Sequence, residues 1–381
     1  MAATEENSPL GALMKAALAL PILVAPTRAA AEGNEIGFNV LGYKERGLMK
    51  ITEPVLWARG TIGEAWDVEG SAAVDIITGA SPRLVSNATG SPVATISGAS
   101  ISDRRNTADV KVTRHFGDFA LGASRTVSDE KDYDSKAFGI QAQWDLNQKN
   151  TTLAAGYGKS NDRVGSTDNP DLHEPRYTQE YMVGITQVVT PVDLVQSTLS
   201  WGRGDGYYDD PYKFTVSFYP DGTLAAAGDT RPDHRDTVSW LTRYRRYFPE
   251  SNAALQADYR YYHDDWGITA HTIEVGWQQS FGDRWEVRPG LRYYTQHQAD
   301  FYFPVIPRPQ PAILSSDQRL GTWGGLSPTI RVVLHLDNAW RIEGTLGYVQ
   351  NSASFHWGGS GSPAFETLRA VYGVLGISRP F

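Results

Sequence analysis

Histidines and aspartates gather in three places where this chain could do chemistry. The segment 263–271 holds two histidines and two aspartates around one turn, and imidazole with carboxylate is a donor set that a divalent metal accepts. The segment 205–210 offers three aspartates, whose oxygens calcium would accept, but it lacks the spacing of an EF-hand loop. These residue types are also common in turns, so we expect no metal site in either segment.

The third place, Asp233–Asp236, sets an acid beside a histidine and is the best candidate for catalysis. A hydrolase or acyltransferase would also need a nucleophile or an activated water within hydrogen-bond reach. Several serines could serve, and the sequence does not choose among them. The chain has no Gly-x-Ser-x-Gly elbow, P-loop or dinucleotide fingerprint. We therefore expect no catalytic residues and no cofactor.

The stretch 271–294 shows which elements must position all such side chains. Apolar and polar residues alternate through it with a period of two, which predicts two amphipathic strands joined by a short turn. A three-residue turn sets Phe281 opposite Trp285 and Glu274 opposite Arg292, and it keeps the two apolar faces together. Strands of about ten residues with aromatics at the ends of the apolar face are typical of outer-membrane barrels.

Composition excludes several other classes of protein. The chain has 381 residues, 41% of them hydrophobic, and after residue 31 it offers no run of apolar residues long enough for a membrane-spanning helix. The absence of cysteine excludes a disulfide scaffold, thiol catalysis and cysteine-based zinc sites. A net charge of −8 argues against nucleic acid as a partner.

The first residues are typical of a secretory signal. A lysine precedes an apolar core at 16–25, and Ala29–Ala31 provides a small-x-small cleavage site. The sequence therefore predicts a signal peptide over residues 1–31 and an outer-membrane barrel over 32–381. Translation could begin at Met1 or at Met14, and a short soluble helix is the alternative for this segment.

Alternating segments recur along the rest of the chain. They predict an all-β fold, a transmembrane antiparallel up-and-down β-barrel of about sixteen strands in the outer membrane of a Gram-negative bacterium. Every second connection is a tight turn and most of the others are long and polar, an asymmetry that a soluble sandwich or propeller does not require. The strands are expected at 34–43, 49–61, 64–77, 107–116, 119–126, 136–146, 151–160, 177–189, 194–203, 237–248, 253–263, 271–281, 285–294, 328–336, 340–351 and 365–381.

One face of these strands is apolar and the other is polar and charged. A barrel of sixteen strands is too wide for side chains to fill, so the polar face is expected to line a wet or plugged lumen. Its arginines and carboxylates could orient an anionic or zwitterionic solute, or they could form an ion-pair network that only stiffens the wall. The charged candidates for the lumen lining are Glu180, Asp258, Arg260, Glu274, Arg288, Arg292, Arg331, Arg341 and Glu343.

The last strand carries a signal of its own. Phe381 is a terminal aromatic, and Val371, Leu375 and Ile377 precede it at even spacings. The pattern resembles the C-terminal signature by which the barrel-assembly machinery recognises outer-membrane barrels. That machinery and the lipids of the outer membrane, lipopolysaccharide included, are therefore the expected partners. The sequence leaves the oligomeric state open.

One further motif lies where a strand enters the first long loop. It runs from Asp75 to Pro82, DIITGASP, and Gly79 within it permits a sharp bend. Together with the segment 43–50, YKERGLMK, it resembles an uncharacterised bacterial family of predicted outer-membrane barrels, a domain-of-unknown-function family. The resemblance implies a barrel location and no established activity. The candidate positions of this rim motif are Arg46, Asp75, Gly79, Ala80, Ser81 and Pro82, with a role in folding the loop or, less simply, in contacting a ligand.

These observations predict a passive function. We expect a porin-like channel for small hydrophilic solutes, or the barrel component of an export system. A membrane-embedded hydrolase or acyltransferase is one alternative, and it requires a catalytic cluster at the rim. A structural or adhesive barrel with a closed lumen is the other, and a lumen plugged by the segment 204–236 would favour it.

Overall fold

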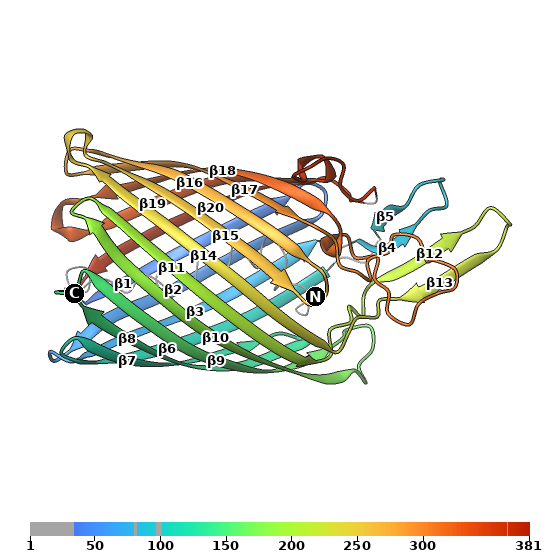
Figure 1. Cartoon of the computed structure of the whole chain (residues 1–381), viewed down its shortest axis with the longest axis horizontal. Helices are drawn as coiled ribbons and strands as arrows, with labels where there is room; N and C mark the ends of the chain where they lie inside the picture. Colours follow the sequence, from blue (N-terminus) through green and yellow to red (C-terminus); the bar gives the residue numbers. More distant parts are fainter. Residues whose placement is uncertain (1–33, 80–81, 97–100, 364) are drawn as a thin grey trace.

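The chain forms a closed antiparallel barrel. The computed structural model describes residues 34–79, 82–96, 101–363 and 365–381, so the predicted signal segment and its cleavage site lie outside the described residues. Neighbouring barrel strands are antiparallel throughout, and β1 pairs with β20 to close the ring (Figure 1). The wall consists, in ring order, of β1 (Glu35–Glu45), β2 (Met49–Ile62), β3 (Trp66–Gly79), β6 (Ile101–Phe116), β7 (Phe119–Asp129), β8 (Tyr133–Leu146), β9 (Thr151–Gly165), β10 (His173–Thr190), β11 (Asp193–Gly206), β14 (His234–Phe248), β15 (Ala253–Asp264), β16 (Thr269–Phe281), β17 (Trp285–Gln296), β18 (Trp323–His335), β19 (Arg341–Ser352) and β20 (Leu368–Pro380).

The sixteen strands confirm the predicted fold class, and each predicted strand has its counterpart in the wall. Several strands run further than expected at one end. β18 begins at Trp323, five residues before the predicted start at 328, because Gly324 and Gly325 interrupt the apolar alternation there. The predicted hairpin register is also confirmed, since Phe281 pairs with Trp285 and Glu274 with Arg292.

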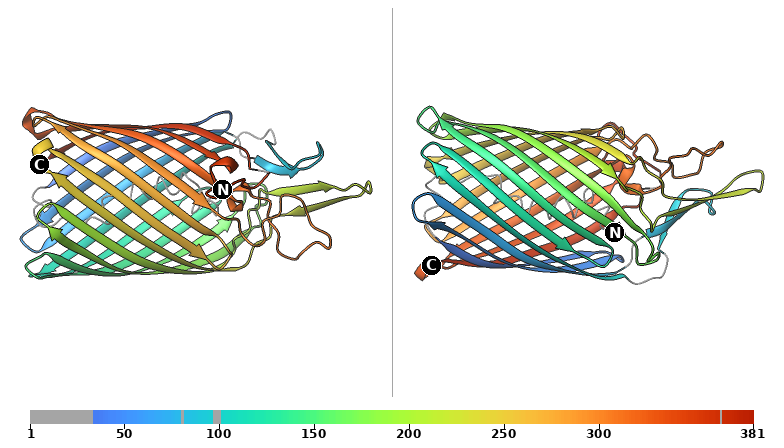
Figure 2. Two further views of the ribbon diagram at one scale, coloured as in Figure 1. Left: turned by 45° about the horizontal axis from the view of Figure 1, so that its top comes forward. Right: turned by 90° about the horizontal axis from the view of Figure 1, so that it is seen from below.

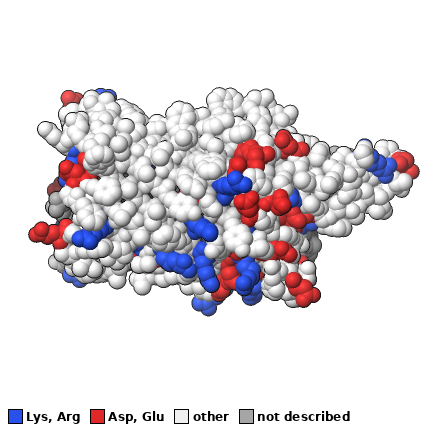
Figure 3. Space-filling model, turned by 60° about the horizontal axis from the view of Figure 1, so that its bottom comes forward, with Lys and Arg blue, Asp and Glu red and all other residues white. Residues whose placement is uncertain are grey.

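The two faces of each strand differ as the alternation requires. Large apolar side chains point outward and are exposed, among them Val183 at 58% and Leu346 at 61% of their surface. On the face shown in Figure 3, charged residues gather at one end of the barrel and over the half next to the cap, and large parts of the remaining surface are uncharged. An exposed apolar band of this extent is costly in water and stable in a bilayer. None of the described helices is long and apolar enough to cross a membrane.

The two ends of the barrel are unlike. At the short-turn end the strands are joined by tight turns such as the one at Gly117, whose φ of +66° suits glycine. At the long-loop end, three long connections build a cap that projects from the barrel (Figures 1 and 2). The cap contains a four-stranded sheet in the order β13 (Leu224–Gly228), β12 (Phe214–Phe218), β4 (Pro82–Ser86) and β5 (Val93–Ile96). The sequence did not predict these strands, because each has only four or five residues.

The cap sheet joins loops that are distant in the sequence. β12 pairs in parallel with β4, and Ser217 on its buried face accepts a hydrogen bond of 2.8 Å from the backbone N–H of Ile306 in the loop 297–322. A lumen plugged by the segment 204–236 would have favoured the structural or adhesive barrel. The segment instead carries β12 and β13 away from the barrel mouth (Figure 1).

A buried ion-pair network fixes the base of the cap. Asp317 accepts hydrogen bonds from Arg231 Nη2 at 3.0 Å and from Arg319 Nε at 2.8 Å. Arg231 also pairs with Asp229 at 2.6 Å, and Arg319 with Asp210 at 2.9 Å. Because the two guanidinium groups each contact two carboxylates, the charges are satisfied although most of them are buried.

Candidate functional site

The inner wall of the barrel holds all nine charged residues predicted to line the lumen. Glu274 faces Asp258 on one side and Arg292 on the other, which fixes the even positions of β15, β16 and β17 to one face. The register continues this face to the odd positions of β18 and β19, where Arg331, Arg341 and Glu343 stand, and round the ring to Glu180 on β10. The opposite face carries the exposed apolar residues, so these charged residues point inward.

Arginines outnumber carboxylates on the arc formed by β14 to β18. Some are paired: Arg245 Nη2 lies 3.1 Å from Asp258 Oδ2, and Arg331 Nη2 lies 2.6 Å from Glu343 Oε2. Arg243 joins the same carboxylate of Asp258 at 3.7 Å. The sequence analysis did not identify Arg243 and Arg245 as lumen-lining, because the arginine-rich run 243–246 obscures which side chains point inward. The spacing of two residues between Arg243 and Arg245, within the predicted strand 237–248, could have placed both on the inner face.

Three further arginines on this arc contact uncharged side chains. Arg260 Nε donates to Ser239 Oγ at 2.9 Å, and Arg288 Nη1 donates to Gln256 Oε1 at 2.9 Å. Arg292 lies over the ring of Tyr294, 5.6 Å from its centroid. Among the described residues none of the three has a carboxylate oxygen within the 4.0 Å of an ion pair, so this arc carries surplus positive charge toward the lumen.

Acidic residues predominate on the arc formed by β2, β3 and β6. The residues that point inward there include Glu53, Asp67, Glu69, Asp75 and Asp109. Lys111 pairs with Glu69 at 3.4 Å and neutralises one of these negative charges. β3 and β15 lie half the ring apart in the strand order, so the acidic arc faces the basic arc across the lumen.

The rim motif lies at the long-loop end of β3, where its residues have mostly structural contacts. Gly79 has a φ of +143°, and a Cβ there would overlap the carbonyl oxygen of Leu48, so this bend requires glycine. Arg46 donates its backbone N–H to Arg369 at 2.9 Å. Pro82 begins β4, and Ala80 and Ser81 lie outside the described residues.

Asp75 differs from the rest of the rim motif because its carboxylate is buried inside the barrel. It is 3% exposed, and its Oδ2 lies 3.7 Å from Arg105 Nε on the neighbouring strand. The same Arg105 nitrogen contacts Glu130, in the turn between β7 and β8. Burial raises the pKa of Glu130 even though the Arg105 guanidinium opposes this shift.

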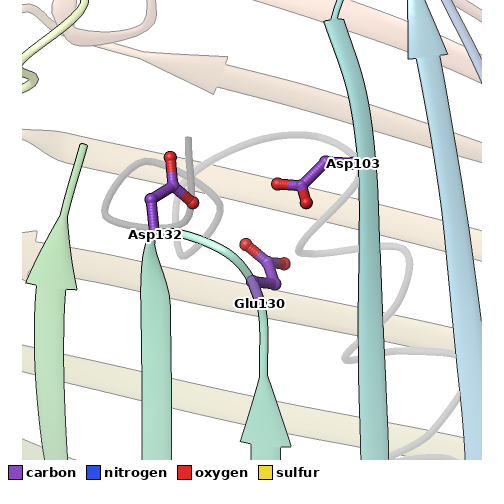
Figure 4. Close-up of side chains that lie close together, drawn as sticks. All are labelled: Asp103, Glu130 and Asp132. Carbon is purple, nitrogen blue, oxygen red and sulfur yellow. The ribbon is translucent and has the colours of Figure 1, made fainter. Parts of the chain in front are cut away.

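Glu130 belongs to a cluster of carboxylates that the sequence reasoning did not single out. Oxygens of Asp103, Glu130 and Asp132 all lie within 4.8 Å of one another (Figure 4). Asp103 is on β6, whereas the other two are in the turn that joins β7 to β8. The acidic run at 129–134, DEKDYD, was the signal in the sequence, but only the ring order brings Asp103 to it.

The candidate acid–base group lies at the outer side of the same rim. His234 Nδ1 lies 2.8 Å from Asp205 Oδ1, and its Nε2 lies 3.4 Å from Asp236 Oδ2 and 3.7 Å from Asp265. Carboxylates therefore occupy both ring nitrogens. Among the described residues no serine hydroxyl is hydrogen-bonded to His234, so the arrangement lacks the nucleophile contact that a hydrolase needs.

In each of the two segments considered for metal binding, the candidate histidine or aspartate side chains contact different partners. His263 contacts Thr269 at 3.1 Å, and His271 contacts Tyr259 at 2.9 Å on the outer surface. Asp264 instead pairs with Arg235 inside the barrel, at 3.0 Å from its Nε. In the segment 205–210 the aspartates likewise have separate partners, with His234, the backbone of Arg231 and Arg319.

Phe381 lies at the short-turn end, after the last strand. Its backbone N–H donates to the carbonyl of Asn34 at 2.9 Å, and its side chain is 73% exposed. Arg379 interrupts the apolar alternation before it and lies over the ring of Trp340, 5.5 Å from the centroid. The aromatic residue is thus accessible from outside the barrel.

Comparison with protein families gives one match. The family described as "Protein of unknown function (DUF3570)" matches residues 10–173 and 166–364. This bears out the kind of family that the resemblance indicated, whereas the Asp75–Pro82 segment as its hallmark stays a prediction. A search of curated proteins finds no match.

Solved structures similar to this one are outer-membrane barrels. CdiB from Acinetobacter baumannii has a TM-score of 0.52 and 8% identity, over 91% of this chain and 60% of that one. A bacterial polysaccharide outer membrane secretin has a TM-score of 0.49 and 9% identity, over 92% of this chain and 99% of that one. The CymD monoaromatic hydrocarbon channel has a TM-score of 0.43 and 11% identity, over 92% and 89%. At these identities the similarity concerns the fold alone.

Proposed function

We propose that this chain, which belongs to the DUF3570 family of proteins of unknown function, is a passive channel for small hydrophilic solutes in the bacterial outer membrane. The single observation that carries the proposal is the closed ring of sixteen strands with an apolar outer face and a charged inner face. Barrels of this strand number are wide enough to leave an aqueous passage, and water is the medium in which charged inner residues are stable.

The inner wall gives this channel a transverse field. The surplus arginines at 260, 288 and 292 stand on one side of the lumen, and the acidic arc stands on the other. A zwitterion passing between them is oriented by both arcs, while a small anion is held near the arginines. The solutes we propose are therefore zwitterionic or anionic, and strongly apolar solutes are disfavoured.

Small side chains on the inner wall between these arcs support an open passage. The inward positions of β7, β8 and β9 include Gly122, Ser124, Gly139, Gly156 and Gly158. A wall of this kind adds little side-chain volume to the lumen. The projecting cap leads away from the mouth, which is also consistent with passage (Figure 2).

Purified protein in planar bilayers tests the proposal. We expect stepwise conductance in potassium chloride and, in a salt gradient, a reversal potential shifted toward anion selectivity. The double variant R288Q/R292Q shifts the reversal potential toward cations. The matched control R284Q removes an exposed arginine that pairs with Asp337 at 3.1 Å at the short-turn end, and it leaves the selectivity near that of the wild type. Absence of conductance together with absence of solute swelling in liposomes refutes the channel.

The proposed location has a test of its own. We expect the protein in the outer-membrane fraction, migrating differently in electrophoresis before and after boiling. A soluble periplasmic protein would contradict both the location and the function.

A further inference from the structure

The carboxylate cluster of Asp103, Glu130 and Asp132 has the dimensions of a calcium site. A calcium ion takes oxygen ligands at about 2.4 Å, so two ligands on opposite sides of it are about 4.8 Å apart. The oxygens of the three residues all lie within 4.8 Å of one another, which allows one ion to reach all of them. Magnesium bonds are shorter, at about 2.1 Å, and suit this spacing less well.

A second observation at the same place concerns Asp75. It is 3% exposed, and no N–H or hydroxyl group of the described residues donates to its Oδ1; its side chain instead meets another carboxyl group, that of Glu53. It points to the same inner face as Asp103, because Asp75 pairs with Arg105 and Ile77 pairs with Asp103 in the register of β3 and β6. Its Oδ2 approaches the Arg105 nitrogen that also contacts Glu130. A buried carboxylate oxygen that no N–H or hydroxyl group of the described residues reaches, next to other clustered carboxylates, is a favourable place for a cation.

The charges around the cluster lead to the same conclusion. Glu53, 4% exposed, is on β2 beside Asp75, so five carboxylate side chains gather here in all. Arg105 contributes one positive charge against them. Buried carboxylates that repel one another need a cation or protons to be stable, and a hard divalent cation is the partner that oxygen ligands select.

We propose that Asp103, Glu130 and Asp132 bind a calcium ion at the rim of the barrel, with Asp75 as the charged neighbour that strengthens the site. The ion links the start of β6 to the turn between β7 and β8. Asp132 also accepts a hydrogen bond from the Tyr212 hydroxyl, at the foot of the cap. Calcium therefore fastens the rim to the loop that carries β12 and β13. The site is separate from the basic arc and does not depend on conduction by the barrel.

Calcium titration of the full-length, refolded protein after removal of metals by a chelator tests this proposal. We expect saturable calorimetric binding at one site in the micromolar to millimolar range, with magnesium weaker by at least tenfold. D103N and E130Q each lower the calcium affinity at least tenfold. The matched control D171N removes an exposed carboxylate from the neighbouring outer loop and leaves the affinity unchanged.

A second measurement keeps the test valid if a variant folds poorly. Thermal unfolding of the wild type in calcium and in chelator needs no substitution, and we expect calcium to raise the unfolding temperature by several degrees because it binds the folded state alone. The double variant D103N/E130Q unfolds at the same temperature in both. An unfolding temperature of the wild type that calcium does not change, or equal calcium binding by D103N, E130Q and D171N, overturns the proposal.

Discussion

Replacing Asp317 by asparagine should open the base of the cap while leaving the barrel wall intact. Asp317 is 1% exposed and accepts hydrogen bonds from the backbone N–H of Arg319 at 3.1 Å, from Arg319 Nε and from Arg231. Asparagine has nearly the same shape but removes the negative charge. Both guanidinium groups then lose one of their two carboxylates.

The size of the effect follows from what remains in the network. Removing one member of a buried ion pair costs about 3–5 kcal/mol when its partner is left without compensation. Asp229 still contacts Arg231 at 2.6 Å, and Asp210 still contacts Arg319 at 2.9 Å, so the lower end of that range applies. A loss of about 3 kcal/mol in the local free energy of opening corresponds to a rise of about 100-fold in the open population.

Trypsin can measure this population, because Arg319 is both a partner of Asp317 and a cleavage site. Under conditions where opening is fast relative to cleavage, the rate of cutting after Arg319 should rise about 100-fold in D317N. D221N is the matched control, because Asp221 pairs with Arg308 at the exposed tip of the cap and should leave that rate unchanged. A D317N rate within threefold of the wild type would show that the network does not hold the cap.

Four further predictions concern acid stability, selectivity, the rim and assembly. Burial alone would raise the pKa of Asp210 and of Asp317, but the positive charges of Arg319 and Lys213 outweigh burial and hold both pKa values below the usual range. The two ionised carboxylates therefore stabilise the cap fully above about pH 4, and this stabilisation is lost as the pH falls further. Pepsin should accordingly cut the cap much faster at about pH 2 than at about pH 4. R292Q alone should move the reversal potential toward cations by about half the shift of the double variant, and an unchanged potential would place Arg292 away from the ion path. G79A should destabilise the rim by about 1–3 kcal/mol, seen as faster proteolysis near residue 80, because alanine rarely adopts its φ. Deleting Phe381 should lower the yield of heat-modifiable barrel in the outer membrane without changing protein synthesis, and an equal yield would remove its role in assembly.

The sequence predicted the wall of this barrel well, because the wall follows a local rule. The period-two pattern and the tight turns identify each wall strand, and one short turn is enough to fix a register such as Phe281 opposite Trp285. The inward positions of Arg288 and Arg331 follow from the same alternation. Nothing beyond the neighbouring residues is needed for these predictions.

The rim and the cap could not be predicted in this way, because they depend on contacts between distant loops. Asp103 meets Glu130 only because β6 and β7 are adjacent and the turn after β7 folds inward. Asp210 reaches Arg319 across more than a hundred residues of sequence, which no periodicity records. The short cap strands leave no alternation long enough to recognise.

The parallel pairing of β4 with β12 also constrains when the cap can form. Asn87 and Phe218, which are hydrogen-bonded within it, lie 131 residues apart in the sequence. Because non-local pairings form slowly, we expect the two strands to meet only after the pairs β3–β6 and β11–β14 have reached their places in the wall, which makes this pairing a late event in folding. An antibody against an epitope that spans β4 and β12 would therefore distinguish fully folded barrels from those still in assembly.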